Sequence, residues 1–319
     1  MFLINNQADD CREDSPGPWL GGSGIVAQFA PKMHPCRDGV ELFMAPTVLP
    51  PSHRSPKRRH VLGVGLGMLA SSGLSLGAQA AKPVRVAAAS DLKFVLTHLL
   101  DQFQQETGIP VQASFGSSGN FVRQIRQGLP VDLFMSADQA WVSQLIQAGL
   151  GRRLAGGAID EGAIYGRGRI AIFLPRNSTL PLDARLQGLK DNWGQVSKFA
   201  IANPEHAPYG RAAREALMRL GLWELVAAKL VLGENIAQAT QFVTTGAAQA
   251  GITALSLALA PELASQGRHL LLDEQLHAPL IQRMILLRGA QADAARLYDY
   301  LLQPAARARM RRYGLDNPA

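Results

Sequence analysis

Residues 84–108 read VRVAAASDLKFVLTHLLDQFQQETG, and this stretch decides the fold class. Residues 84–88 form a short apolar run typical of a buried strand. Apolar side chains then recur at helical spacing from Leu92 to Phe103, and Gly108 ends the helix. A strand that passes through a short turn into a helix is the repeating unit of α/β proteins.

The same unit recurs along the chain. Further strands are predicted at 111–115, 131–135, 170–174, 199–202, 230–232, 250–253 and 281–287, and helices at 121–127, 141–149, 212–220, 237–245 and 290–302. This alternation predicts parallel sheets with helices on both faces. Strands 170–174 and 281–287 are expected to carry the chain between two lobes. We therefore expect one lobe of residues 81–174 with 282–319, and a second lobe of residues 175–281.

Composition narrows the class of protein. The chain has 319 residues, of which 47% are hydrophobic and 18% charged, as in folded soluble proteins. The formal net charge of +7 comes from scattered Lys and Arg without interleaved aromatic residues, so a nucleic-acid partner is not expected. The two cysteines, Cys11 and Cys36, are too few for a disulfide scaffold or a cysteine zinc site.

The first 80 residues are predicted to lie outside the working protein. Residues 1–53 are rich in Pro and Gly and lack any regular period, so they are interpreted as non-structural or as a misplaced start, with Met33 or Met44 as the alternative. Residues 54–80 combine a basic stretch, an apolar run and Ala78-Gln79-Ala80, the pattern of a signal peptide that directs export to the periplasm. Arg58-Arg59 leaves both twin-arginine and Sec export open.

Two serines lie where predicted strands end and helices begin. Ser90 follows Ala87-Ala88-Ala89, and Ser118 lies in Phe115-Gly116-Ser117-Ser118-Gly119-Asn120. Ligands of open α/β sheets bind at such strand ends, and helix N-termini attract anions. The alternatives are a plain helix cap for Ser90 and an ordinary tight turn around Ser118. Two turns of the same kind favour an anion site.

Two similar positions occur in the second half. Tyr209 lies between Pro208 and Gly210 at a predicted helix start, so its N–H has no partner inside the helix. Ile236 follows Asn235, which is itself a suitable N-cap. Packing for Tyr209 and capping at Asn235 are the structural alternatives to donating N–H groups to a ligand.

At these positions the sequence resembles the periplasmic molybdate-binding proteins of ABC-type transporters. The resemblance covers residues 82–316, and the segments that carry it are AAASDL (87–92), SFGSSGN (114–120), DLFMSADQ (132–139), NPEHAPYG (203–210) and Tyr313-Gly314. It implies a type II periplasmic binding protein fold, in which two lobes close on a tetrahedral oxyanion. It also implies delivery to an inner-membrane ABC permease, a monomeric state, no enzymatic activity and no resident cofactor.

The resemblance further implies the ligand set. Ser90 and Ser118 would donate hydroxyls and amides, and Tyr209 and Ile236 would donate amides, so that molybdenum is held as molybdate, or as tungstate. Asp91 would offer its N–H while its carboxylate points away from the anion. Many members place a tyrosine hydroxyl on the ligand where this chain has Ala254. The sequence leaves open whether the Tyr209 hydroxyl replaces it.

Other functions are considered against the same residues. A phosphoryl or sulfuryl hydrolase needs a nucleophile with a base, or a metal cluster, and neither accompanies the serine turns. The sensing domain of a transcription regulator would need a helix-turn-helix before it, where this chain has an export signal. A binding protein for sulfate or another tetrahedral oxyanion is the closest alternative, and neither it nor the molybdate–tungstate preference is decided by the residues.

Overall fold

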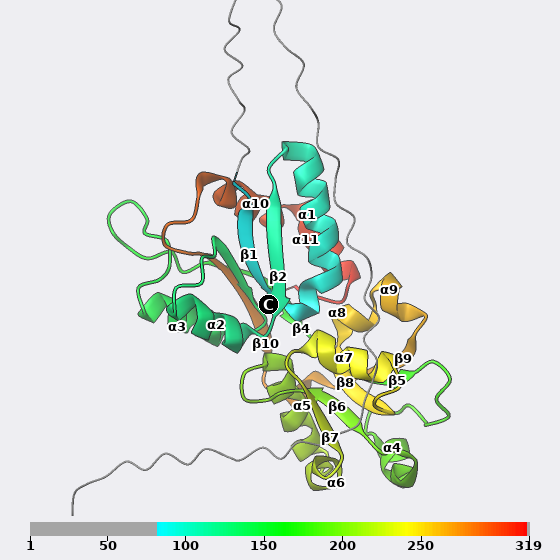
Figure 1. Cartoon of the computed structure of the whole chain (residues 1–319). Helices are drawn as coiled ribbons and strands as arrows, with labels where there is room; N and C mark the ends of the chain where they lie inside the picture. Colours follow the sequence, from blue (N-terminus) through cyan, green and yellow to red (C-terminus); the bar gives the residue numbers. More distant parts are fainter. Residues whose placement is uncertain (1–81, 318–319) are drawn as a thin grey trace, which may run out of the picture. The chain divides into compact units, whose positions relative to one another are not determined.

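The computed structural model of the chain describes residues 82–317. The interpretations of residues 1–53 as non-structural and of 54–80 as a signal peptide fall outside this range. The described part contains two five-stranded sheets flanked by helices (Figure 1). The prediction of a two-lobed α/β fold is confirmed.

The first sheet has the strand order β2-β1-β3-β10-β4. Its strands are β1 (Val84–Ala89), β2 (Val111–Gly116), β3 (Leu133–Ser136), β4 (Ala163–Gly168) and β10 (Leu280–Leu286). β1 pairs in parallel with β2 and β3, whereas β10 is antiparallel to both β3 and β4. The strand near the chain's end therefore completes the first sheet, as the sequence predicts.

The second sheet has the strand order β7-β6-β8-β5-β9. Its strands are β5 (Ile170–Pro175), β6 (Phe199–Ala202), β7 (Leu230–Gly233), β8 (Ala250–Ala254) and β9 (Gly267–Leu271). β6 is parallel to β7 and β8, and β5 is antiparallel to β8 and β9. Both sheets are thus mixed.

Two expectations are corrected here. The sheets are not purely parallel, because β5 and β10 enter their sheets directly from the other lobe and not through a crossover helix. β5 also belongs to the second sheet, so the lobe boundary expected after residue 174 lies too late in the chain. The crossing into the second lobe falls between β4 and β5, and the return precedes β10.

The helices divide between the lobes. The first lobe contains η1 (Ser90–Leu92), α1 (Lys93–Thr107), α2 (Ser118–Arg126), α3 (Gln139–Gln147), α10 (Ala292–Leu302) and α11 (Pro304–Arg312). The second contains α4 (Gln187–Asp191), η2 (Trp193–Gln195), α5 (Pro208–Arg219), α6 (Trp223–Ala227), α7 (Ile236–Thr244), α8 (Leu255–Ala258), α9 (Pro261–Ala264) and η3 (Glu274–Leu276). No helix within residues 82–317 has both the length and the apolar character needed to cross a membrane.

Apolar side chains bury both faces of each sheet. In the first lobe, α1, α10 and α11 pack on one face, and α2 and α3 pack on the other (Figure 1). In the second lobe, α5 and α6 join the larger core, while Val243 of α7 packs with Phe173 and Ala200 in a smaller cluster. Ala89 and Ala137, at the ends of β1 and β3, belong to the larger core of the second lobe. The carboxyl ends of these strands therefore face the other lobe.

An ion pair between a half-exposed arginine and a buried aspartate fixes the start of the central strands. Asp132, just before β3, accepts hydrogen bonds from the Arg85 backbone N–H at 2.9 Å and from the Arg85 Nε and Nη2 atoms at 3.0 and 3.1 Å. Burial acts to raise the pKa of Asp132, but the hydrogen bonds and charge of Arg85 outweigh it, and the pKa lies below its usual range. The pair lies at the amino ends of the strands, away from the turns that carry the serines.

Replacing Asp132 by Ala is expected to lower the free energy of unfolding by about 2 kcal/mol, because a buried backbone N–H loses its acceptor. The lowered pKa of Asp132 means that this contribution is present above about pH 4 and lost as the pH falls through the folded-state pKa. Urea unfolding at neutral and acid pH measures both effects. The exposed Asp101→Ala on α1 is the control, with a change within about 0.5 kcal/mol; equal losses in the two variants would contradict the prediction.

Candidate functional site

Ser90 lies directly after β1 and begins η1. It does not cap that turn, because Ala89 occupies the cap position and no side-chain capping bond is present. The Ser90 hydroxyl instead accepts a hydrogen bond of 3.3 Å from the N–H of Ala237 in the second lobe. Since a hydroxyl can accept and donate at once, its proton is left to donate to another oxygen. Ser90 is 3% exposed, so that oxygen must belong to a buried group.

Ser118 is the first residue of α2 and is 1% exposed. Its hydroxyl accepts a hydrogen bond of 3.1 Å from the N–H of Ala137, so it too keeps its proton for another acceptor. The preceding Ser117 donates its hydroxyl to the His206 carbonyl at 2.6 Å, and Gly119 donates its N–H to the same carbonyl at 3.0 Å. The start of α2 is therefore fastened to the segment that leads into α5 of the second lobe.

Close packing at this junction requires glycine at position 119. A Cβ atom there would lie 2.7 Å from the His206 carbonyl oxygen and 2.8 Å from the Trp141 ring. The turn around Ser118 is therefore not an ordinary tight turn chosen for its backbone angles, since Gly119 is needed for the approach of the other lobe.

Tyr209 and Ile236 occupy the first turns of two helices in the second lobe. Tyr209 follows Pro208 in α5, and Ile236 is the first residue of α7 after its N-cap, Asn235. The Asn235 side chain accepts from the Gln238 N–H at 3.1 Å, so the capping interpretation of Asn235 is correct. Neither the Tyr209 nor the Ile236 N–H has a hydrogen-bond partner among the residues that the structure describes. Both are positioned to donate to a ligand.

A cleft opens beside Ser90. It has a volume of about 500 Å³, and its walls include Ser90, Lys93, Phe115, Asn235 and Ala237. Both lobes contribute to this lining, so a small solute can reach the Ser90 turn from solvent. The structure thus brings the five residues predicted from the sequence, Ser90, Asp91, Ser118, Tyr209 and Ile236, to one region between the lobes.

Asp91 turns its carboxylate toward Tyr209 and Gln282. Its Oδ2 atom accepts from the Tyr209 hydroxyl at 3.0 Å and from Gln282 Nε2 at 2.8 Å. Burial raises the pKa of Asp91 to about 6, although the hydrogen bonds from Gln282 and Tyr209 act in the opposite direction. The Tyr209 hydroxyl is therefore engaged by a carboxylate, which favours an amide role for Tyr209 toward the ligand.

Position 254, where the chain has alanine in place of a tyrosine donor, is surrounded by groups that already have partners. Ala254, at the end of β8, is fully buried, and the neighbouring Thr253 hydroxyl contacts the Thr240 hydroxyl. Thr240 in turn donates to the Ile236 carbonyl at 2.8 Å. These hydroxyls stabilise the first turn of α7 and supply no replacement donor.

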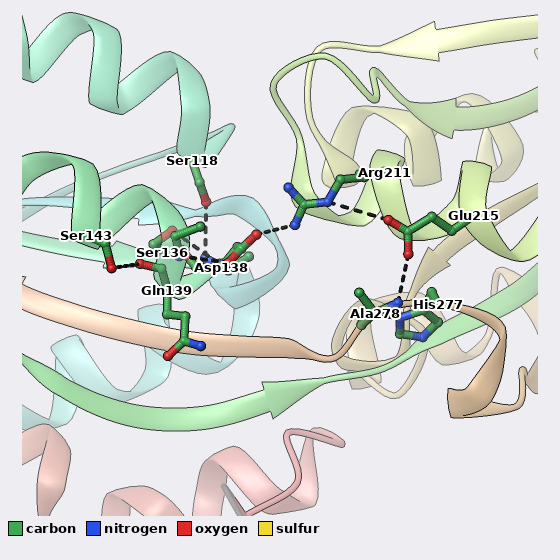
Figure 2. Close-up of polar contacts among 11 residues, drawn as sticks. Ser118, Ser136, Asp138, Gln139, Ser143, Arg211, Glu215, His277 and Ala278 are labelled. Atoms are coloured by element: carbon green, nitrogen blue, oxygen red, sulfur yellow. Dashed lines mark hydrogen bonds and ion pairs between the residues drawn. The ribbon is translucent and has the colours of Figure 1, made fainter.

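A second polar network connects the Ser118 turn with α5 (Figure 2). Ser118 accepts from Ala137, the adjacent Asp138 pairs with Arg211 of α5, and Arg211 lies 3.8 Å from Glu215. Glu215 accepts from the Ala278 N–H at 2.7 Å, in the segment that returns to the first lobe. The arginine charge is thus neutralised by two carboxylates and is not presented to a ligand as a single cation.

Sequence reasoning missed several residues of this region. Gln282 was hidden inside the apolar strand 281–287, where an isolated amide was the signal that a buried polar partner existed. His206, Asp138 and Arg211 lie in or beside quoted motifs, but their contacts join segments far apart in the chain. Their pairing depends on the packing of the two lobes, which no local pattern encodes.

The chemistry of the site is that of neutral donors. The candidate residues supply two hydroxyls and the amides of two helix first turns, and within residues 82–317 no group of three or more His, Cys, Asp or Glu side chains is arranged to hold a metal ion. Such hydroxyl and amide donors suit an oxyanion.

Comparisons with known proteins agree with this chemistry. Residues 84–316 match the family model described as bacterial extracellular solute-binding protein. The molybdate-binding protein ModA of Azotobacter vinelandii is 35% identical over 264 residues, which cover 80% of this chain and 96% of that protein. ModA of Escherichia coli K12 is 30% identical, covering 72% of this chain and 88% of that protein.

Structural comparison gives the same relationship. The solved Azotobacter vinelandii periplasmic molybdate-binding protein superimposes with a TM-score of 0.66 at 27% identity, covering 74% of this chain and 100% of that chain. The family match, the sequence relatives and this fold each cover most of the chain. The chain therefore belongs to the bacterial extracellular solute-binding proteins, among the relatives that include the ModA molybdate-binding proteins.

Proposed function

We propose that this protein captures molybdate outside the cytoplasm and delivers it to an ABC-type permease. The observation that carries the proposal is that two buried serine hydroxyls of the first lobe and helix N-terminal amides of the second lobe, unpaired within the described residues, lie at the junction between the lobes. The 35% identity to a molybdate-binding protein supports molybdate as the anion. We include tungstate in the proposal because it has the same charge and tetrahedral shape.

Binding follows from the geometry. An oxyanion entering the cleft would receive O–H groups from Ser90 and Ser118 and N–H groups from Tyr209 and Ile236, which replace its hydration shell. The positive ends of α5 and α7 add partial charge without a cationic side chain. Because the dianion itself forms no ion pair with a side chain, it can be released when a permease separates the lobes.

The remaining parts of the proposal concern the context of the protein. We propose a monomeric, non-enzymatic binding protein without a resident cofactor, exported to the periplasm after removal of residues 1–80. The relatives named as molybdate-binding proteins support the binding-protein part of this proposal. Calorimetric titration with molybdate, tungstate, sulfate and phosphate tests the choice of anion; tight binding of sulfate with weak binding of molybdate would replace the proposal with the sulfate alternative.

Ser90→Ala and Ser118→Ala are each expected to weaken molybdate binding about tenfold to a hundredfold, because each removes a hydrogen bond to a charged group worth about 1.5–3 kcal/mol. Each variant is also expected to unfold at a somewhat lower temperature, because the N–H of Ala237 or Ala137 loses its acceptor, so affinity is measured well below the melting temperature. The control is Ser143→Ala on α3, whose hydroxyl bonds to the Gln139 carbonyl in its own helix (Figure 2). Unchanged affinity in both site variants would mean that the site lies elsewhere.

The Asp138–Arg211 pair is expected to hold the closed form. Arg211→Gln should weaken molybdate binding by up to about fivefold and speed its release, a modest effect because the Arg211 side chain is 42% exposed. The difference from the unaltered protein should shrink at high salt. Arg214→Gln, which removes a contact to Glu205 within the second lobe, is the matched control. Stopped-flow measurement of the molybdate release rate compares the two variants. Equal rates would refute the role of the Asp138–Arg211 pair in holding the closed form.

A further inference from the structure

The Asp91 carboxyl is held by both lobes at once. Tyr209 of the second lobe donates its hydroxyl to Asp91 Oδ2, and Gln282 of the first lobe donates from Nε2 to Asp91 Oδ2 and, at 3.0 Å, to the Tyr209 hydroxyl. Ser256 of the second lobe donates to the Asp91 carbonyl at 2.9 Å. We call Asp91, Tyr209 and Gln282 the carboxyl cluster.

The carboxyl cluster packs against the end of β4, just before the chain crosses to the second lobe. Gly168 ends β4, and a Cβ atom there would lie 2.3 Å from the Tyr209 hydroxyl and 2.9 Å from Gln282 Nε2. Tyr209, Asp91 and Gln282 are 2%, 1% and 0% exposed. The hydroxyl of Tyr209 can occupy this position only when the second lobe is packed against the first, so the cluster belongs to the closed form.

The hydrogen bonds of the cluster are incomplete for an ionised Asp91. Among the described residues, Asp91 Oδ1 and Gln282 Oε1 are both buried without a hydrogen-bond partner. Both are acceptors, on side chains that already share a hydrogen bond. A proton on Asp91 Oδ1 would supply the donor that this pair lacks, and it would remove a buried charge.

Every group that faces the Asp91 side chain is uncharged. Tyr209 of α5 and Tyr165 of β4 are the facing titratable groups, and burial raises the pKa of both well above the usual value, so both stay protonated. The other segments packed against η1, namely α7, α8 and β2, carry no charged side chain. Three charged side chains are close to the cluster residues in sequence, and each has another partner or faces solvent. Arg211 of α5 pairs with Asp138, Arg283 of β10 bonds to Gln139, and Lys93 of α1 is exposed.

The carboxyl cluster is connected to the proposed oxyanion site by neighbouring and shared residues. Asp91 follows Ser90, and Tyr209 supplies both the hydroxyl on Asp91 and the N–H offered to the anion. A dianion held there and an ionised Asp91 would repel each other in a region of low dielectric. We propose that Asp91 takes up one proton from solvent when the oxyanion binds, so that capture is coupled to protonation of the carboxyl cluster. This inference rests on the proposed function.

The direction of the effect follows from linkage. Burial already raises the pKa of Asp91 to about 6, and a neighbouring dianion raises it further. The bound form then holds the proton over a pH range in which the free form has lost it. Affinity is therefore highest in acid and falls as the pH rises above about 6, by about tenfold between pH 6 and pH 8.

The test is isothermal titration calorimetry of the purified protein with molybdate, and separately with tungstate, from pH 6 to pH 8. Repeating the titration at pH 7 in two buffers of different ionisation enthalpy gives the number of protons taken up. We expect uptake approaching one proton for each anion bound. Titrations without proton uptake and with a constant affinity would overturn the inference without any variant.

Variants assign the proton to Asp91. Asp91→Asn keeps the shape of the side chain and imitates the protonated acid, so its affinity should be independent of pH and its proton uptake absent. Tyr209→Phe removes a hydrogen bond that lowers the pKa of Asp91, so the fall in affinity should move to higher pH. If Asp91→Asn does not fold, Tyr209→Phe and the buffer comparison still decide the question.

The matched control is His206→Gln, because His206 lies at the same junction and contacts Ser117 at 3.0 Å. Its affinity can change, but its pH slope and proton uptake should equal those of the unaltered protein. Loss of proton uptake in His206→Gln, with retention in Asp91→Asn, would assign the proton to the histidine and refute the inference. Failure of the unaltered protein to bind either anion at any pH would instead refute the proposed function.

Discussion

The proposed site depends on backbone N–H groups that have no partner inside their own helices. Every α-helix begins with such groups, and here the first turns of α5 and α7 meet the turn after β1 and the start of α2. A buried N–H without an acceptor is costly, so these groups favour an acceptor from outside the chain. The two serine hydroxyls add donors at the same place. The proposed function uses these groups to hold an anion without a fixed positive charge.

The same constraint explains why the small residues occur where they do. Ala89 packs with the core of the second lobe, and Gly119 allows that lobe to approach the start of α2, because a Cβ atom at position 119 would collide with the His206 carbonyl. The serine turns therefore serve two purposes. They place donors, and they permit the contact between lobes that removes water from around those donors.

Much of the fold was predictable, because its signals are local. The strand–helix alternation, the helix end at Gly108 and the return of 281–287 to the first sheet follow from periodicity and helix-terminating residues. The direction of β5 and β10 was not predictable, since entry into a sheet directly from the other lobe leaves no periodic trace in either strand. β4 and β9 were missed because their residues, such as Arg167 and His269, do not form an apolar run.

The candidate site shows the same division. Ser90, Ser118, Tyr209 and Ile236 were predictable because each lies at a helix start, whereas Gln282 and Arg211 act through partners more than 70 positions away. The orientation of the Asp91 carboxylate illustrates most clearly the difference between local and long-range signals. The sequence indicates that its carboxylate points away from the anion, but only the packing of Tyr209 and Gln282 shows where it points.

The place of β10 in the first sheet has a consequence for biosynthesis. β10 lies between β3 and β4, although residues 169–279 separate it from β4 in the chain. Asp316, near the chain's end, also exchanges backbone hydrogen bonds of 2.9 and 3.0 Å with Arg167. The second lobe is one continuous segment, so it is complete before β10 can join the first sheet. A nascent chain therefore lacks the strand that joins β3 to β4 until residues 280–286 have been synthesised.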